Sequence, residues 1–357
     1  MLNSKFTGLL DETKNVMKVF SAVYAEYVTR GDNPANVLKI KEDTLDLGSM
    51  PGNSILVGML AAPINPSDVN QIEGTYGLQP PLPAVAGNEC LGLVLRTGAN
   101  CTTHKQNSLV VPRKHGLGTW RSAVICPEDD FYPLASVKPS EVDVGQMSTL
   151  LVNPCTAYLM LKELTPLKEG DVVSFNAASS QVCLHLTQLC KHFGFKSLAV
   201  LRDGKDFEYH REKLEKSGAT WVVKEGYTSA DIKALGVPPV ALALNSVGGK
   251  SSEGLAKLLR PEGVMATYGG LGKEAVIVPT PKLLFHDIVS RGFWLTKWFK
   301  THPDRVSEIY DTVSDLIVSG VIKADLKLMD WNNGEGMETA VTEAYKPTKP
   351  GKTVMIM

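Results

Sequence analysis

The chain has 357 residues, of which 43% are hydrophobic and 21% are charged, and its formal net charge is −1. This length favours two domains, because a single hydrophobic core stops growing beyond roughly 250–300 residues. The composition excludes a disordered chain and gives no indication of nucleic acid or an anionic membrane as a partner. The apolar run at residues 55–64 is too short to span a bilayer and is interrupted by Gly58 and Pro63.

Short strands dominate the first third of the sequence. They are predicted by apolar runs between turn residues such as Gly31 and Gly52. The runs lie at residues 18–25, 37–40, 54–61, 89–95 and 108–112. Because helical periodicity is weak here, residues 1–150 are predicted to form a mostly β domain.

The pattern changes after Pro139. A helix is predicted over residues 140–164, with Ser140 as its cap and Asp143 in its first turn. Apolar strands then alternate with helical stretches, at residues 172–176, 197–202, 221–223, 240–245, 263–268 and 293–298. This alternation predicts a doubly wound, Rossmann-type parallel sheet over residues 151–301, covered by helices on both faces.

The last part of the chain, from about residue 302 to 357, is expected to complete the first domain. It holds a helical stretch near residues 305–319 and an apolar run at 353–357. The expectation follows because the predicted parallel sheet already has its six strands.

The strand at residues 172–176 is followed by a loop of small residues and an amphipathic helix. Such a turn can hold a pyrophosphate on the N-terminus of the helix. The usual glycine positions of the loop hold Gln181 and Cys183, so the loop alone fits a plain turn without a ligand equally well.

The next strand ends on Arg202 and Asp203, where a unit of this kind meets the adenosine ribose. An acidic residue there bonds a ribose 2′-hydroxyl and favours NAD, whereas an arginine grips a 2′-phosphate. We therefore predict NADPH as the cofactor. The alternative for Arg202 is a surface charge at the end of a strand.

Taken together, the chain resembles the mitochondrial trans-2-enoyl-thioester reductases, which belong to the zinc-free branch of the medium-chain dehydrogenase/reductase superfamily. The matching blocks include Gly-Thr-Tyr-Gly at residues 74–77 and Asn-Pro-Cys-Thr-Ala-Tyr at residues 153–158. The others lie at residues 62–68, 82–89, 116–120, 244–252, 267–270 and 291–295. The blocks are short but follow the order of the family from about residue 18 to the C-terminus.

The resemblance implies a Rossmann domain joined to a mostly β, GroES-like catalytic domain. It also implies NADPH-dependent reduction of a 2-enoyl-CoA or 2-enoyl-acyl-carrier-protein to the saturated acyl thioester, in mitochondrial fatty acid synthesis. A homodimer joined through the cofactor-domain sheets and a mitochondrial location are expected on the same ground. The first twenty residues do not show a presequence pattern.

No metal is expected. Zinc-dependent relatives carry a histidine where this chain has Asn88, and their metal-binding cysteines find no counterpart at residues 67–68 or 152–153. The six cysteines have no zinc-knuckle spacing and are predicted to be reduced, mostly buried thiols. The seven histidines form no pair four residues apart. Without a metal to serve, Glu89 is expected only to hold its loop.

Hydride addition to the β-carbon of an enoyl thioester leaves negative charge on the thioester oxygen, so a hydrogen-bond donor is required there. Tyr76 is the candidate, because it lies between Gly74 and Gly77 and the family assigns its catalytic tyrosine to this motif. A phenol with a pKa of about 10 stays protonated at neutral pH. The alternative is a tyrosine that merely packs in a glycine-rich loop.

Cofactor-binding residues are carried over from the resemblance. They are Asn153, Ser179, Ser180, Gln181, Val182, Arg202, Asp203, Gly204, Tyr268, Gly269, Gly270, Leu271, Phe293, Trp294, Leu295 and Lys352. Asn153 is expected to bond the nicotinamide carboxamide or to orient the tyrosine. Close relatives often carry a second arginine where this chain has Gly204, a departure for which Lys205 would compensate.

Two other functions stay open. A zinc-free NADPH quinone reductase would share the fold and the arginine that selects NADPH. A non-catalytic protein would follow if Gln181 and Cys183 had abolished cofactor binding.

Overall fold

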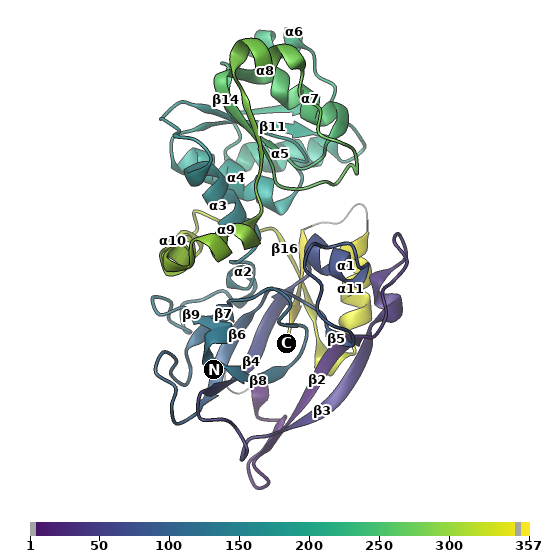
Figure 1. Cartoon of the computed structure of the whole chain (residues 1–357), viewed down its shortest axis with the longest axis vertical. Coiled ribbons are helices and arrows are strands. Elements are labelled where there is room, and N and C mark those ends of the chain that lie inside the picture. The colour runs from purple at the N-terminus through teal and green to yellow at the C-terminus, as the bar shows by residue number, and fades with distance from the viewer. Residues whose placement is uncertain (1–4, 347–350) are drawn as a thin grey trace. The chain divides into compact units, whose positions relative to one another are not determined.

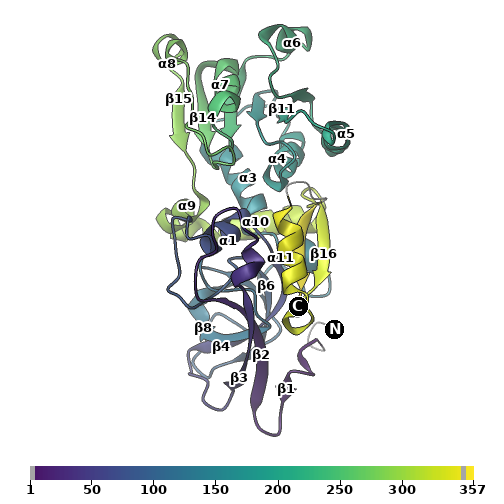
Figure 2. The same ribbon diagram turned by 90° about the vertical axis from the view of Figure 1, so that its right-hand side faces the viewer.

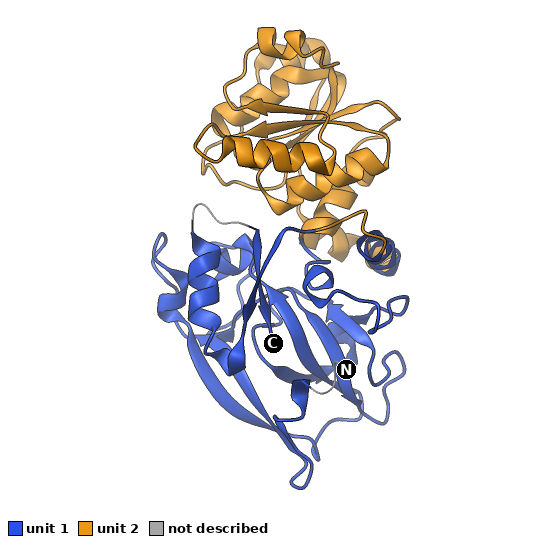
Figure 3. Cartoon of the chain, turned by 180° about the vertical axis from the view of Figure 1, so that it is seen from behind, with its two compact units in different colours: residues 1–152, 307–318, 324–357 blue, residues 153–306, 319–323 orange. Residues whose placement is uncertain are grey.

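The chain passes from a mostly β unit into an α/β unit at residue 153 and returns after residue 306 (Figure 3). Unit 1 comprises Met1–Val152, Ser307–Val318 and Ala324–Met357, and unit 2 comprises Asn153–Val306 and Ser319–Lys323. The structure is a computed structural model that describes residues 5–346 and 351–357. In that part of the chain no helix is long and apolar enough to cross a membrane.

Unit 1 contains two sheets (Figure 1). The smaller sheet consists of β1 (Leu10–Asp11), β2 (Val16–Tyr24), β3 (Lys39–Asp46) and β5 (Ala84–Val85). The larger has the order β16-β17-β4-β6-β7-β9, with β8 also paired to β4. Its strands are β4 (Ser54–Pro63), β6 (Leu91–Thr97), β7 (Leu109–Pro112), β8 (Ala123–Pro127), β9 (Phe131–Pro133), β16 (Leu326–Asp330) and β17 (Lys352–Ile356).

Strand β4 is the centre of unit 1, and all ten of its residues are buried. It pairs antiparallel with β6, β8 and the C-terminal strand β17, so the end of the chain is built into the first domain. Unit 1 also contains helices. They are η2 (Pro34–Val37), α1 (Pro66–Ile72), η3 (Glu128–Asp130), α2 (Val144–Met147), α10 (Val306–Val318), η5 (Asn332–Gly334) and α11 (Met337–Tyr345).

Unit 2 is built on a parallel sheet with the order β12-β11-β10-β13-β14-β15. The strands are β10 (Val172–Phe175), β11 (Lys196–Leu201), β12 (Trp221–Lys224), β13 (Val240–Asn245), β14 (Leu259–Thr267) and β15 (Val289–Gly292). The helices are α3 (Asn153–Glu163), α4 (Gln181–His192), α5 (Phe207–Ser217), α6 (Ser229–Ala234), α7 (Gly249–Leu258), α8 (Thr280–His286), α9 (Leu295–Thr301) and η4 (Pro303–Arg305). Strands β10 and β13 are buried throughout, as expected for a parallel sheet covered on both faces.

The predicted Rossmann-type α/β fold class is therefore confirmed. Strands β10 and β13 are neighbours from which the chain winds in opposite directions. Ligands of such sheets bind outside the carboxyl ends of the strands at this switch point. The fold thus singles out the loops that follow β10 and β13.

Two predicted elements are wrong. The helix over residues 140–164 is broken into α2 and α3, and Asp143, not Ser140, caps α2 by accepting a hydrogen bond from Gln146 N. A new helix begins at Asn153 because Pro154 has no N–H to donate and is well placed in a first helical turn.

The other wrong element is the strand at residues 293–298. Strand β15 ends before this segment, at Gly292, and helix α9 begins at Leu295. The buried side chains of this segment are Leu295 and Trp298, which lie three residues apart. That spacing suits one face of a helix, which a short apolar run does not distinguish from a strand.

Candidate active site

Asn176 joins the two loops at the switch point of unit 2. Its side chain is fully buried; Nδ2 donates to Asn245 Oδ1 at 2.8 Å, and Oδ1 accepts from Ser246 N at 2.8 Å. The carboxyl ends of β10 and β13 are therefore locked together by side-chain hydrogen bonds. This fixes the position of the predicted cofactor loop.

The loop after β10 delivers the N-terminus of α4 to this edge of the sheet. Ala177 turns the chain with a φ of 49°, and Ser180 caps the helix by accepting from Cys183 N at 3.3 Å. Ser179 is exposed, whereas Gln181 and Val182 are half-buried in the first turn. The first N–H groups of a helix attract anions, so the loop can still hold a phosphate although its glycines are missing.

Cys183, one of the two departures from the glycine pattern, points into unit 2. Its thiol donates to Asn176 O at 3.3 Å and lies 3.5 Å from the hydroxyl of Tyr268. Burial raises the pKa of Cys183 to about 11, so the group stays a thiol. The side chain is fully buried and does not block the exposed end of the helix. As the sequence predicts, none of the six cysteines forms a disulfide.

The segment after β14 runs along the loop that follows β13. Tyr268 N donates to Asn245 O at 2.9 Å, and Leu271 N donates to Ser246 O at 2.8 Å. A Cβ at Gly269 would lie 3.1 Å from Ser246, whereas one at Gly270 would point into open space. The glycines therefore allow close packing on one side and leave room for a ligand on the other.

Arg202, Asp203 and Gly204 follow β11 and are all exposed. Asp203 Oδ1 lies 3.0 Å from Lys224 Nζ, so this carboxylate forms an ion pair with the lysine. Arg202 has no ion-pair or hydrogen-bond partner for its guanidinium in the part of the chain that the structure describes. It is therefore available to an external anion.

Residues 293–295 follow the edge strand β15. Phe293 N donates to Thr267 O at 2.9 Å, Trp294 is 44% exposed, and Leu295 is buried. Asn153 begins α3, and its buried Nδ2 has no hydrogen-bond partner among the described residues. A buried amide of this kind suits a polar ligand, because an unsatisfied donor destabilises the folded state.

Tyr76 lies in the loop after α1 of unit 1. The amides of Thr75 and Tyr76 both donate to Asn70 O, at 2.8 and 3.1 Å, and Gln79 Nε2 donates to Tyr76 O at 3.1 Å. Gly74 turns the chain with a φ of 69°. The loop is thus held by hydrogen bonds, and the Tyr76 side chain is half-buried.

Lys352, a predicted cofactor-binding residue, is buried inside unit 1. Its ammonium donates to Asn65 Oδ1 at 2.5 Å and to Ile64 O at 3.4 Å. The same asparagine donates through Nδ2 to Glu89 Oε2 at 2.8 Å, and Glu89 Oε1 accepts from Val152 N at 2.8 Å. Burial raises the pKa of Glu89 to about 7, against the opposing effect of the lysine.

From the sequence, Glu89 was expected only to hold its loop. In the structure its carboxylate links its own segment to those of Asn65 and Val152. No local pattern could have shown this, because Val152 lies 63 residues away in the chain. Among residues 5–346 and 351–357, no group of three or more His, Cys, Asp and Glu side chains is arranged to hold a metal ion. Independence of a metal stays a prediction.

We expect the free energy of unfolding to fall as the pH is lowered from about 6.5 to about 4. The cause is His115, which precedes Gly116, the residue whose amide donates to Asn88 Oδ1. Burial lowers the pKa of His115 to about 4, and its Nδ1 has no described partner. The unfolded chain therefore takes up the proton first, so the stabilisation present above the unfolded pKa is lost as the pH falls. Urea unfolding of wild type and His115→Gln across this range should show a steeper loss for wild type.

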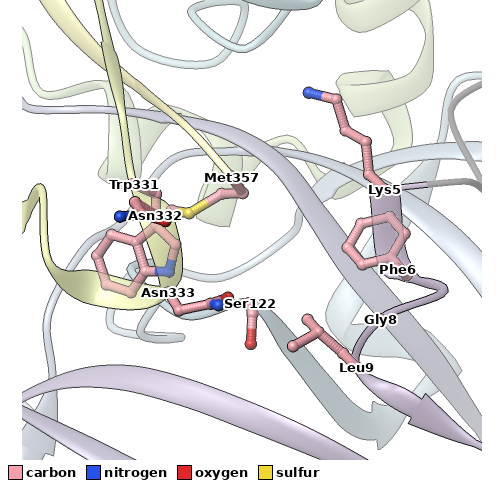
Figure 4. Close-up of a pocket in the computed structure, with 9 residues that line it drawn as sticks. All are labelled: Lys5, Phe6, Gly8, Leu9, Ser122, Trp331, Asn332, Asn333 and Met357. Atoms are coloured by element: carbon pink, nitrogen blue, oxygen red, sulfur yellow. The ribbon is translucent and has the colours of Figure 1, made fainter.

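A cavity of about 240 Å³ lies elsewhere in unit 1 (Figure 4). It is lined by Lys5, Phe6, Gly8, Leu9, Ser122, Trp331, Asn332, Asn333 and Met357. None of the predicted site residues is among them. The cavity is therefore no part of the candidate active site.

Comparison with known proteins agrees with both units. Residues 51–136 match the family described as alcohol dehydrogenase GroES-like domain, and residues 182–315 match the one described as zinc-binding dehydrogenase. The human mitochondrial enoyl-[acyl-carrier-protein] reductase is 38% identical over 348 residues, covering 95% of this chain and 89% of the relative. The chain belongs to the mitochondrial enoyl-[acyl-carrier-protein] reductase family. The resemblance identified in the sequence is thereby confirmed.

Other members of the reductase family are similarly close. The Dictyostelium discoideum enzyme of the same name is 38% identical over 316 residues, covering 86% of this chain and 89% of that one. Among solved structures, the Etr1p/NADP/crotonyl-CoA complex has a TM-score of 0.86 at 28% identity and covers 96% of this chain and all of that chain. The Etr1p/Etr2p heterodimer of Candida tropicalis has the same TM-score at 29% identity, with the same coverage.

Proposed function

We propose that this chain is a mitochondrial, NADPH-dependent reductase that converts trans-2-enoyl thioesters into saturated acyl thioesters. The observation that carries the proposal is membership of the reductase family over nearly the whole chain. The proposed substrates are enoyl groups on acyl carrier protein, which the names of the relatives state, or on CoA, as in the Etr1p complex with crotonyl-CoA.

The residues of unit 2 fit NADPH. Arg202 is exposed, has no partner among the described residues and would bind the 2′-phosphate, while Ser179, Ser180 and the first amides of α4 would bind the pyrophosphate. The open side of Gly270 leaves room for the cofactor, and the unpartnered amide of Asn153 would bond the nicotinamide carboxamide. When bound, NADPH supplies the hydride.

Tyr76 is proposed to act on the substrate. Its hydroxyl would donate a hydrogen bond to the thioester oxygen, which becomes negatively charged as hydride reaches the β-carbon. The same phenol is the proposed source of the proton that the α-carbon needs. The proposal is supported by the Gly-Thr-Tyr-Gly motif and by the hydrogen bonds that hold its loop.

The direct test is NADPH oxidation, followed by absorbance, with trans-2-hexenoyl-CoA as substrate. Oxidation with this thioester and not with quinones is the expected result. Activity on quinones alone would replace the proposal with a quinone reductase. Calorimetry that detects no NADPH binding at millimolar concentration would exclude both enzymes.

A homodimer is also proposed, through the edge strand β15 and helix α8, which lie together at one edge of unit 2 (Figure 2). All four residues of β15 are exposed, and Leu284 and Phe285 on α8 are 69% and 79% exposed. An unpaired strand beside exposed apolar side chains favours association with a second copy. Light scattering is expected to give twice the chain mass of 38.7 kDa, and a monomer at micromolar concentration would exclude this dimer.

A further inference from the structure

Six polar side chains form one hydrogen-bonded cluster in the interior of unit 1. They are Asn65, Asp68, Gln71, Asn88, Glu89 and Lys352, and none is more than 5% exposed. The cluster holds two carboxyl groups and one ammonium group. Asn65 contacts all three, because its backbone amide also donates to Asp68 Oδ2 at 2.7 Å.

Asn88 connects this cluster to the loop of Tyr76. Its Nδ2 donates to Asp68 Oδ1 at 2.7 Å and to Gln71 Oε1 at 2.6 Å, and its Oδ1 accepts from Gly116 N at 2.6 Å. Both the nitrogen and the oxygen of the Asn88 amide are therefore hydrogen-bonded. The bond that it donates to Gln71 Oε1 fixes which way the Gln71 amide faces.

Gln71 in turn holds the end of the Tyr76 loop, at Leu78. With its oxygen held by Asn88, its Nε2 donates to Leu78 O at 2.9 Å. Residues 71 and 78 flank Tyr76 in the chain, so one buried side chain ties the start of the loop to its end. The exposed surface of the loop plays no part in this link.

Glu89 connects the cluster to Val152, the last residue of the first segment of unit 1. Both oxygens of its carboxylate accept hydrogen bonds, one from Asn65 Nδ2 and the other from Val152 N. Val152 is the residue at which the chain leaves unit 1, and Asn153 follows it. The carboxylate therefore fixes the backbone that immediately precedes the unpartnered amide of Asn153.

We propose that Gln71 and Glu89 are positioning residues for the reduction, Gln71 for the loop of Tyr76 and Glu89 for the backbone before Asn153. The inference rests on the proposed function. Replacing a whole buried ionic cluster by apolar packing of equal volume often changes stability little, whereas removing one partner leaves the others buried and unpaired and destabilises the fold. A positioning role predicts that substitutions lower catalysis or cofactor binding by more than the loss of stability explains, because displacements of about 1 Å matter there.

The first experiment compares Gln71→Met with Gln146→Met. Gln146 is a matched control, because its Nε2 also donates to a backbone carbonyl, Ala324 O, at 2.9 Å in the same unit. For Gln71→Met we expect kcat to fall about ten- to a hundredfold while the Kd for NADPH stays unchanged. For Gln146→Met we expect kcat to be unchanged. Rates are divided by the fraction of protein that binds NADPH, which removes the effect of misfolded enzyme.

The second experiment compares Glu89→Gln with Glu128→Gln. The control carboxylate also accepts backbone N–H groups, from Thr102 and Thr103. Glutamine at position 89 would turn one acceptor into a donor, so the Kd for NADPH is expected to rise about tenfold, more than kcat falls. If Glu89→Gln does not fold, Glu89→Asp keeps the charge, shortens its reach and is expected to show the same shift.

The outcomes separate this inference from the proposed function. An active wild type with unchanged kcat in Gln71→Met and unchanged cofactor affinity in both Glu89 variants would overturn the positioning role and leave the reductase intact. Equal losses of kcat and affinity that track thermal stability would also overturn it, because a general structural defect predicts no separation. A wild type that reduces no enoyl thioester would overturn the proposed function, and the inference with it.

Discussion

Tyr76→Phe is expected to slow turnover about a hundredfold or more while leaving the affinity for NADPH unchanged. The substitution keeps the ring, so the loop hydrogen bonds of the backbone at residues 75 and 76 remain. It removes only the hydroxyl that we propose to stabilise the thioester oxygen. Loss of one such donor raises the activation free energy by about 2.7–4 kcal/mol. Steady-state rates with trans-2-hexenoyl-CoA and calorimetric titration with NADPH measure the two quantities.

Tyr27→Phe is the matched control. The ring of Tyr27 lies against Gly74 of the same loop, and the side chain is 46% exposed. Removing this hydroxyl keeps the packing, so turnover should stay at the wild-type value. If Tyr76→Phe also turns over at that value, Tyr76 has no part in the chemistry and the packing alternative is correct.

The sequence predicted most of the fold of unit 2, because buried parallel strands are continuous apolar runs. Strand β13 was predicted at residues 240–245 and begins and ends there. The strand predicted at residues 293–298 was wrong, because the buried residues there lie three apart and belong to helix α9. The single helix predicted over residues 140–164 was wrong because a new helix begins at Asn153, with Pro154 in its first turn.

The candidate site was predictable only where its residues form local motifs. Tyr76 and Arg202 belong to short patterns that the sequence displays, and Arg202 has no partner in the part of the chain that the structure describes, as an anion site requires. The cluster around Asn65 was not predictable, since Lys352 and Asn65 are 287 residues apart in the chain. Contacts of this range depend on the pairing of β17 with β4, which no local pattern specifies.

The direction in which a side chain points could not be predicted from the sequence either. Because Cys183 occupies a glycine position of the loop, the sequence left open that cofactor binding was lost. The thiol points inward, to Asn176 O, because its position in the first turn of α4 faces the sheet. Asp203 was expected at the ribose; its carboxylate lies 3.0 Å from Lys224 Nζ, a pairing that the sequence did not suggest, and the roles of Asp203 and Arg202 toward the cofactor stay predictions.

Arg202→Ala is expected to reduce the preference for NADPH over NADH about ten- to a hundredfold, by weakening NADPH binding alone. A bidentate guanidinium–phosphate contact contributes roughly 1.5–3 kcal/mol, and NADH has no 2′-phosphate to receive it. Arg202→Lys should lie between wild type and Arg202→Ala, because an ammonium group cannot make the paired contact. Calorimetric Kd values for the two cofactors give the ratio directly.

Arg211→Ala is the control for general electrostatics, because Arg211 is on the next helix, α5, and is paired with Glu208. Its removal changes the charge of unit 2 by the same amount and should alter neither Kd. Equal weakening of NADPH and NADH by Arg202→Ala would show that the arginine does not read the 2′-phosphate. An unchanged ratio together with a loss of preference in Lys205→Ala would instead transfer selection to Lys205, the residue next to Gly204.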